Sequence, residues 1–264
     1  MSAHVALLTD FGLEDNYVGT LKAVILKINP KACVVDICHS IPPQDILAAA
    51  LILKGSYLYF SKKTIFLIVV DPGVGSKRKA IILKTKDYTF IAPDNGILSL
   101  ISDENRQRQI FKITNDKYFL KPTSNTFHGR DVFAPVAAYL SKGLKPNTFG
   151  PERKELKKLI FPKPQLNKRE KQIDGEIIYI DRFGNLMTNI EEGDIGGVSD
   201  DVFISIKNKI ISGIRRSYYS VLKARPLAII NSMGYLEIAV NQDSASRILK
   251  AKKGEKVRLN FFNL

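Results

Sequence analysis

Residues 68–78 read IVVDPGVGSKR, and this stretch decides the fold class. A run of aliphatic, mostly β-branched residues ends in a carboxylate, Asp71, and a turn rich in Pro and Gly then leads to Arg78. Open α/β sheets place acidic residues in this way at the carboxyl ends of buried strands, where they bind their ligands. The stretch therefore predicts an α/β domain with a ligand site at the end of this strand.

The same pattern occurs twice more in the N-terminal part of the chain. Residues 5–9 (VALLT) lead into Asp10, and residues 34–35 lead into Asp36. A single Asp after a strand often does no more than start a turn. Three of them, with Arg78 close in sequence to one, favour a functional crevice with an acidic edge.

Strand-like and helix-like segments alternate before residue 150. The expected strands are 5–9, 33–37, 65–70, 79–84 and 88–92. The expected helices are 15–28, 44–60, a short one after residues 93–96, and 129–140. This alternation predicts an α/β domain with a mainly parallel sheet over residues 1–150.

The pattern changes after residues 151–172, a basic stretch with three prolines that reads as a connector. Short strand-like runs separated by Gly, Asn and Asp follow, at 175–182, 202–206, 209–212, 227–231, 235–240 and 256–262. Only 243–251 reads as helix. Residues 173–264 are therefore predicted to form a small β-barrel or sandwich domain.

Composition and charge exclude several classes of protein. The 45% hydrophobic and 25% charged residues are ordinary for a soluble globular protein. The longest apolar run, 46–53, is far short of the roughly 20 residues that a membrane helix needs, and no secretory signal pattern opens the chain, so a cytoplasmic location is expected. The net charge of +14 accompanies no recognition helix, zinc finger or aromatic RNA-binding motif, so nucleic acid is not an expected partner.

Neither a metal site nor a disulfide framework is indicated. Cys33 and Cys38 are the only cysteines, and with no further Cys or His cluster around them they read as reduced core thiols. The three histidines are too scattered to predict a metal site.

Three further segments combine residue types suited to ligand binding. Residues 126–131 (TFHGRD) put His128 at a helix start, where the helix dipole disfavours imidazolium and would leave a neutral proton acceptor. Residues 183–185 (FGN) place an aromatic face beside an amide, which suits a purine, and residues 231–241 bracket a strand with polar residues. Taken singly, a helix cap, a Gly-Asn turn and a core strand explain these segments at least as well.

Together these segments resemble the S-adenosyl-L-methionine (SAM) hydroxide adenosyltransferases, or SAM hydrolases, which are relatives of the fluorinase and chlorinase enzymes. Six motifs occur in the family's order, at 8–12, 71–75, 93–96, 127–131, 183–185 and 231–241. The resemblance implies an N-terminal α/β domain and a C-terminal β-barrel. It also implies a homotrimer that holds SAM between the N-terminal domain of one subunit and the C-terminal domain of its neighbour.

The resemblance assigns a hydrolase triad to Asp71, Arg78 and His128. In halogenating relatives an aromatic residue replaces this aspartate and the histidine is missing, so the chain looks like the hydrolase branch. Asp10 matches the carboxylate that binds the ribose hydroxyls. The other matched positions are Asp181 and Ser232 for the methionine amino group, and Phe183, Asn185 and Tyr218 for adenine, with Asn241 nearby but without a single role.

The expected reaction is hydrolysis of SAM to adenosine and L-methionine by in-line attack of an activated water on the ribose 5′ carbon. No metal or cofactor is expected, because SAM is the substrate and its thioether leaves as a neutral group. The alternatives are a non-catalytic SAM or adenosine sensor, which the complete triad disfavours, and a methyltransferase, which lacks the expected Gly-x-Gly after the first strand. Whether Asp71 or His128 takes the proton stays open.

Overall fold

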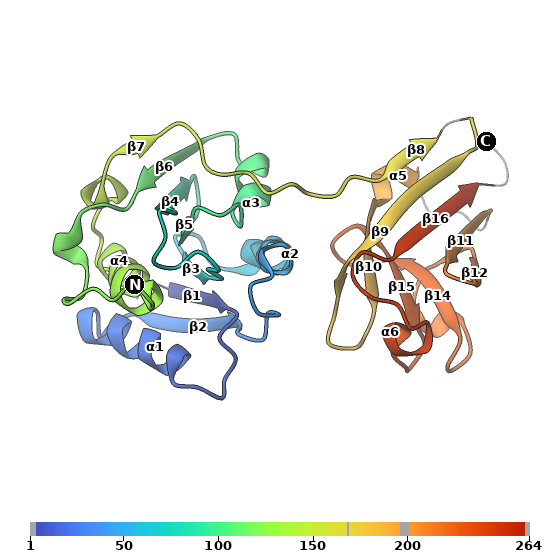
Figure 1. The fold of residues 1–264 in the computed structure, drawn as a ribbon, viewed down its shortest axis with the longest axis horizontal. Coiled ribbons are helices and arrows are strands. Elements are labelled where there is room, and N and C mark those ends of the chain that lie inside the picture. Colours follow the sequence, from blue (N-terminus) through green and yellow to red (C-terminus); the bar gives the residue numbers. More distant parts are fainter. Residues whose placement is uncertain (1–3, 168, 196–200, 262–264) are drawn as a thin grey trace. The chain divides into compact units, whose positions relative to one another are not determined.

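The computed structural model describes residues 4–167, 169–195 and 201–261 (Figure 1). The chain divides into two compact units, Met1–Ile160 and Phe161–Leu264. Parts of the expected connector pair with strands: β7 (Glu152–Arg153) pairs with β6 (Arg108–Lys112), and β8 (Gln165–Asn167) pairs with β9 (Gln172–Ile180). The domain limits expected from the sequence stay a prediction. Within the described residues, no helix has the length and apolar character to cross a membrane.

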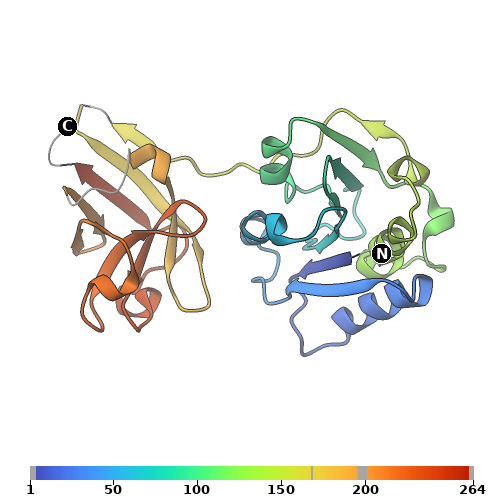
Figure 2. The ribbon, with the colours of Figure 1, turned by 180° about the vertical axis from the view of Figure 1, so that it is seen from behind.

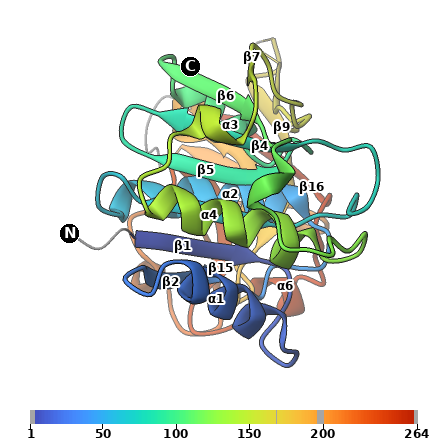
Figure 3. The ribbon, with the colours of Figure 1, turned by 90° about the vertical axis from the view of Figure 1, so that its left-hand side faces the viewer.

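The first unit is a seven-stranded sheet with helices on both faces. Its strands are β1 (His4–Thr9), β2 (Cys33–Cys38), β3 (Ile65–Val69), β4 (Ala80–Thr85), β5 (Thr89–Pro93), β6 and β7. Its helices are α1 (Tyr17–Ile28), α2 (Ile46–Ser56), α3 (Ser99–Glu104) and α4 (Ala134–Ser141). Figure 3 shows α1 and α4 in front of the strands and α2 behind them.

The sheet has mixed pairing, in the order β2-β1-β3-β5-β4-β6-β7. The first four strands pair in parallel, and β4, β6 and β7 pair antiparallel with their neighbours. A mainly parallel sheet is therefore not confirmed. The reason is local: β4 and β5 are joined by the short turn at 86–88, and a tight turn without a crossover helix can only join antiparallel strands.

The order of the parallel strands reverses between β1 and β3. From β1 the chain passes through α1 to β2 on one side, and from β2 through α2 to β3 on the other side of β1. The two strands are in direct register, with Thr9 opposite Val69 at their carboxyl ends. In open α/β sheets such a switch point is where ligands bind.

Both faces of the central strands are buried, which explains their continuous apolar sequences. Leu7 of β1 and Leu67 of β3 pack in one core with Leu21 and Ile25 of α1 and with α4. The alternate residues of β1 and β3 are buried as well. Full burial of each such side chain stabilises the fold by about 1.5–3 kcal/mol.

The helices are shorter than the sequence predicts, and one begins irregularly. Asp45 caps α2 by accepting a hydrogen bond from the Ala48 N–H, so the helix starts at Ile46, and it ends at Ser56, with one 3₁₀ turn over Tyr57–Tyr59. The helix expected at 129–140 begins as a π-helical turn, Gly129–Phe133, which then continues as α4.

The interpretation of both cysteines as core thiols is wrong. Cys33 is exposed and Cys38 is only partly buried, although both are free thiols. The reason is that β2 is the edge strand of the sheet and is less covered than the strands inside it.

The second unit is a nine-stranded sheet, whose strands Figures 1 and 2 show from opposite sides. The strands that follow β8 and β9 are β10 (Leu186–Glu191), β11 (Val202–Ile206), β12 (Lys209–Ser212), β13 (Ile214–Arg215), β14 (Pro226–Ile230), β15 (Tyr235–Val240) and β16 (Lys256–Phe261). The short helices are α5 (Glu192–Ile195) and α6 (Ala245–Ile248). The helix expected at 243–251 is thus a single turn, and residue 262 of the last expected strand lies outside the described residues.

Pairing in this unit follows the path β12-β11-β16-β9-β10-β15-β14-β13, with β8 added at β9. No pairing between β12 and β13 closes the path among the described residues, so a closed barrel is not confirmed. The sequence missed β10 because Thr188 and Asn189 interrupt its apolar pattern. Both side chains are buried and bonded, Thr188 to the Leu236 carbonyl at 2.8 Å and Asn189 to the Glu176 N–H at 2.7 Å.

Candidate functional site

A cavity of about 400 Å³ lies at the carboxyl ends of β1 and β3. Asp10 follows β1 and Asp71 follows the end of β3, and both line the cavity. His128 reaches it from the start of the π-helical turn. The prediction of an acidic crevice is confirmed for the two strand-end residues, since β1 and β3 are adjacent parallel strands.

Asp36 does not belong to this crevice, so the third part of that prediction is wrong. The residue lies within β2 and pairs with Leu7 of β1, so it is not at a strand end. Its carboxylate lies 2.6 Å from Lys22 Nζ and 3.0 Å from His39 Nε2. The sequence run of Val34 and Val35 located the strand but not its last residue.

Arg78 joins Asp71 to His128. Its Nε donates to both Asp71 carboxylate oxygens at 2.9 Å, and its Nη2 donates to Asp71 Oδ2 at 2.5 Å. The same Nη2 lies 2.7 Å from His128 Nδ1. The guanidinium packs over the Phe133 ring, 5.2 Å from its centroid, and only 11% of the Arg78 side chain is exposed. Arg78 is not among the residues that line the cavity, but it holds Asp71 and His128, which are.

This contact fixes the protonation pattern of His128. A guanidinium has N–H donors and no acceptor, so His128 Nδ1 must accept the hydrogen bond, and the neutral ring then carries its proton on Nε2. Burial, followed by the positive charge of Arg78, lowers the pKa of His128 below its usual value and outweighs the opposing effect of Asp71 and Asp131. This direction agrees with the neutral imidazole that the sequence predicted, and burial and Arg78 are causes that the sequence did not indicate.

Two glycines allow the end of β3, the loop from Asp71 to Arg78 and the π-helical turn to pack closely against one another. Gly129 starts the π-helical turn against the end of β3, where a Cβ would meet Val69 Cγ1 at 3.4 Å and Phe127 Cε2 at 3.2 Å. Gly75 has φ +75°, and a Cβ there would collide with the backbone carbonyl of Asn125. The loop between Asp71 and Arg78 thus packs directly on the segment that precedes His128.

Asp10 is held in place from the start of the segment before α2. Its Oδ2 accepts a hydrogen bond from the Gln44 N–H at 2.8 Å, and Gln44 adopts a left-handed backbone with φ +65°. Burial raises the pKa of Asp10, Asp71 adds to the rise, and the Gln44 N–H partly offsets it. The other carboxylate oxygen accepts no hydrogen bond from another of the described residues, so it can accept one from a ligand hydroxyl.

Three aromatic residues that the sequence did not single out line the same cavity. Tyr17 and Phe127 meet edge to face at 5.2 Å between ring centroids, and Phe11 lies 5.4 and 5.9 Å from them. Phe11 and Phe127 fall inside the family motifs at 8–12 and 127–131, but nothing in the sequence pattern indicated that Tyr17, at the start of α1, would join them. The cavity therefore combines polar groups on one part of its wall with an aromatic part.

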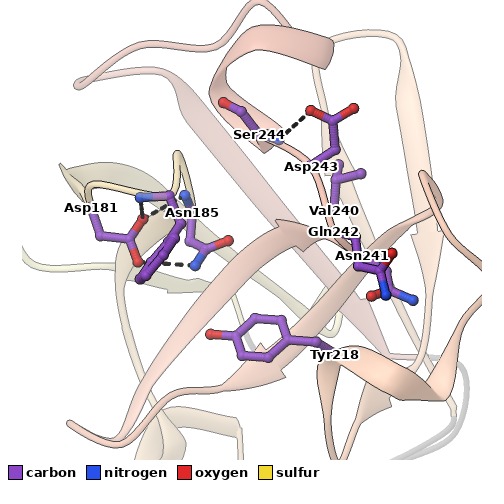
Figure 4. A pocket seen from close by; sticks show the side chains of 9 residues that line it. Asp181, Asn185, Tyr218, Val240, Asn241, Gln242, Asp243 and Ser244 are labelled. Carbon is purple, nitrogen blue, oxygen red and sulfur yellow. Dashed lines mark hydrogen bonds between the residues drawn. The ribbon is translucent and has the colours of Figure 1, made fainter.

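The second unit has its own pocket, of about 600 Å³ (Figure 4). Four of the predicted residues line it: Asp181, Phe183, Asn185 and Tyr218. Asn241 lines it too, together with residues that the sequence missed, Val240, Gln242, Asp243 and Ser244. The missed residues directly follow or adjoin Asn241 in sequence, which was the only signal for them.

Ser232 is not brought into this pocket. It is exposed on the turn that follows β14 and is not among the lining residues. Of the two positions that the resemblance matches to the methionine amino group, Asp181 lines the pocket that holds the matched adenine residues and Ser232 lies outside it.

Asp181 organises the loop that carries Phe183. Its Oδ1 accepts hydrogen bonds from the Phe183 and Asn185 N–H groups, both at 2.9 Å, and its Oδ2 accepts one from Asn185 Nδ2 at 2.9 Å (Figure 4). Gly184 has φ +85° at the centre of this loop. Phe183 is left 77% exposed, so its ring is available to stack on a planar ligand.

A buried carboxylate near this pocket escaped the sequence reading. Glu237 lies in β15, where it looks like one polar residue in a core strand, and it accepts hydrogen bonds from Tyr218 and Asn231.

In the described part of the chain, no group of three or more His, Cys, Asp or Glu side chains is arranged to hold a metal ion.

Comparisons with known proteins agree with this division of the chain. Residues 5–150 match the SAM hydroxide adenosyltransferase N-terminal domain, and residues 175–258 match the C-terminal domain of the same family. A Thermus thermophilus protein named (R)-S-adenosyl-L-methionine hydrolase is 37% identical over 97% of this chain and 98% of its own. A fluorinase from Actinoplanes is 25% identical over 90% of each chain.

The fold is also found in a solved structure. The crystal structure of an uncharacterized conserved protein from Thermotoga maritima matches with a TM-score of 0.89 and 39% identity, over 97% of this chain and 99% of that one. The resemblance drawn from the six motifs is confirmed by these matches.

Proposed function

Because the chain belongs to the SAM hydroxide adenosyltransferase family, we propose that it hydrolyses S-adenosyl-L-methionine to adenosine and L-methionine. The observation that carries this proposal is the linked set of Asp71, Arg78 and His128 at the carboxyl ends of β1 and β3. The three residue types of the hydrolase branch are present and in hydrogen-bond contact. SAM is the substrate, and the proposed reaction uses no cofactor.

The reaction needs catalysis at the nucleophile, which is water, and not at the leaving group. The water oxygen forms a bond to the ribose 5′ carbon while the bond from that carbon to sulfur breaks and its electron pair stays on sulfur. Methionine leaves as a neutral thioether, so no general acid is needed. The protein has to hold a water in line with sulfur and accept its proton, which are the contributions of orientation and general-base catalysis.

We assign the proton to Asp71. His128 Nδ1 is occupied by Arg78, and the neutral ring presents an N–H at Nε2, so His128 acts as a donor that orients the water through a lone pair. Asp71 has the remaining acceptor lone pairs of the set, since Arg78 has none. Arg78 holds the carboxylate by two of its nitrogens and so fixes the direction in which the water is bound.

We propose that the two pockets bind different parts of the substrate. Asp10 binds the ribose hydroxyls in the first unit, and Phe183, Asn185 and Tyr218 bind adenine in the second. Asp181 and Ser232 serve the methionine amino group. We propose, on the family resemblance, that the protein is a homotrimer in which the two pockets that share one SAM come from different subunits.

The direct test is product analysis after a long incubation of the purified protein with SAM in buffer containing a metal chelator. We expect adenosine and L-methionine in equal amounts, separated by chromatography, with ¹⁸O from labelled water in the adenosine 5′-hydroxyl. S-adenosylhomocysteine with a methylated acceptor would contradict the proposal. So would unchanged SAM recovered from a bound complex, which is the behaviour of a sensor.

Replacing Asp10 by alanine should weaken the binding of SAM and adenosine together. The ribose hydroxyls lose a charged acceptor, so we expect a loss of about 1.5–3 kcal/mol in binding free energy, measured by calorimetry. Asp116→Ala is the matched control, because Asp116 is an exposed carboxylate paired with Lys121 outside the cavity. Unchanged adenosine affinity in Asp10→Ala would show that the ribose lies elsewhere.

A further inference from the structure

Glu237 is a buried carboxylate to which the proposed reaction gives no task. It is 5% exposed and lies between Leu236 and Ile238, which face the core of the second unit. Because successive side chains of a strand alternate, Glu237 faces the opposite side of the sheet. A buried carboxylate destabilises a fold unless its oxygens accept hydrogen bonds, so its partners indicate why it is there.

Each oxygen of Glu237 has a different donor. Tyr218 Oη donates to Oε1 at 2.7 Å, and Asn231 Nδ2 donates to Oε2 at 3.2 Å. No Lys or Arg of the described residues forms an ion pair with it. Burial, and then Asp181, raises the pKa of Glu237, against the effect of its two hydrogen bonds. Burial and the bond to Glu237 raise the pKa of Tyr218, so the phenol stays a donor.

Tyr218 depends on this bond for its position. It begins the 3₁₀ turn Tyr218–Ser220, which lies between β13 and β14, and the residue is 43% exposed. Figure 4 shows the ring across the pocket from Asp243 and Ser244. The hydroxyl bond to Glu237 ties a wall of the pocket to a central strand.

Asn231 carries the same restraint into the turn that follows β14. Its Oδ1 accepts hydrogen bonds from the Met233 N–H at 3.0 Å and the Tyr235 N–H at 3.1 Å. The amide oxygen is thereby committed to the turn, and the amide nitrogen is left to point at Glu237. Ser232 lies inside this turn, so the carboxylate fixes the turn that presents it.

We propose that Glu237 is a positioning residue that couples the adenine wall at Tyr218 to the turn carrying Ser232. This inference rests on the proposed function, which gives those two positions to opposite ends of SAM. Both partners donate to the carboxylate, and Asn231 cannot reverse its amide without losing two backbone hydrogen bonds. Tyr218 can reverse its role, because a hydroxyl also accepts, so a glutamine can still contact both partners and only a side chain without oxygen atoms removes both contacts.

The test compares Glu237→Met, which has similar length but no oxygen atoms, with Glu176→Met, a matched control whose carboxylate pairs with Lys256 in the same unit. Affinities for adenosine and for L-methionine are measured separately by calorimetry, and kcat and KM are measured for SAM. We expect Glu237→Met to weaken the binding of both ligands and raise KM by about tenfold or more, as for loss of a hydrogen bond to a charged group. At saturating SAM, kcat should stay within about threefold, since the water-activating residues are in the first unit.

A second variant separates the coupling from a general loss of fold. Tyr218→Phe removes one partner of Glu237 and leaves Asn231 in place, so it should weaken adenosine and spare L-methionine. It also serves if Glu237→Met does not fold. The inference is overturned if Glu237→Met binds both ligands like the native protein, or if Tyr218→Phe leaves adenosine affinity unchanged. A native protein that binds both ligands but does not turn over SAM would contradict the proposed function alone.

Discussion

Asp71→Asn should lower the single-turnover rate of SAM hydrolysis by about 10²–10⁴-fold, the usual contribution of a general base. Asparagine has the size of aspartate, but it has one acceptor oxygen and no basic site for the proton of water. Its amide N–H groups would also face the donors of Arg78, which now approach the carboxylate at 2.5–2.9 Å. SAM affinity should stay within a few-fold, because the partner of Asp71 is the water and not the ligand.

Asp94→Asn provides the control for this experiment. Asp94 is also a buried aspartate bonded to an arginine, with Arg153 Nη1 at 2.8 Å, but it lies outside the cavity. Both variants should lose some thermal stability, and only Asp71→Asn should lose rate. A normal rate in folded Asp71→Asn would end the role of this residue in activating water.

His128→Ala should also reduce turnover strongly, through loss of the donor that orients the water and of the acceptor that holds Arg78 Nη2 at 2.7 Å. Combined with Asp71→Asn, the loss should be smaller than the product of the two single losses, because groups that act as one unit do not contribute independently. The measurement is the single-turnover rate of the two single variants and the double variant, alongside their melting temperatures. Multiplicative losses would mean that the residues act separately.

The pH profile gives the same assignment a second readout. The pKa of His128 lies below its usual value of 6.5, so the ring is neutral at neutral pH and becomes charged as the pH falls through that lowered pKa. Protonation places a hydrogen on Nδ1 and a like charge beside Arg78, which breaks the contact. Native turnover should therefore fall on the acid side, below pH 6.5, and His128→Ala should lack this fall. If His128 only capped the start of the helical turn, the variant would keep both the rate and the pH profile.

Local sequence was sufficient for the strand ends that carry the cavity. A buried strand that ends in Asp is visible at Asp10 and Asp71, because the apolar run and the turn residues are consecutive. The same pattern gave a wrong prediction for Asp36. A run of apolar residues does not show at which residue a strand ends, and β2, at the edge of the sheet, continues past Asp36 to Cys38. The antiparallel pairing of β4 was not predicted, because the sequence pattern of a strand does not show which neighbour it pairs with.

Residues that act through distant partners were out of reach of the sequence. Glu237 has the pattern of a chance polar residue in a core strand, and only its contacts with Tyr218 and Asn231 reveal its acceptor role. Ser232 shows the converse, a matched motif position that lies outside the pocket. Motif matching found residue types in order, whereas the hydrogen-bond partners needed the fold.

The ion pair between Asp71 and Arg78 also bears on the charge of the substrate. The sulfonium of SAM is positive when bound and neutral once the bond to carbon has broken. During in-line attack the positive charge passes from sulfur to the water oxygen, on the side of the 5′ carbon where Asp71 binds the water, so a carboxylate there stabilises the transition state more than the bound substrate. Because Arg78 balances the charge of Asp71 at hydrogen-bond distance, the mostly buried carboxylate stays charged and can offer its remaining lone pairs to the water.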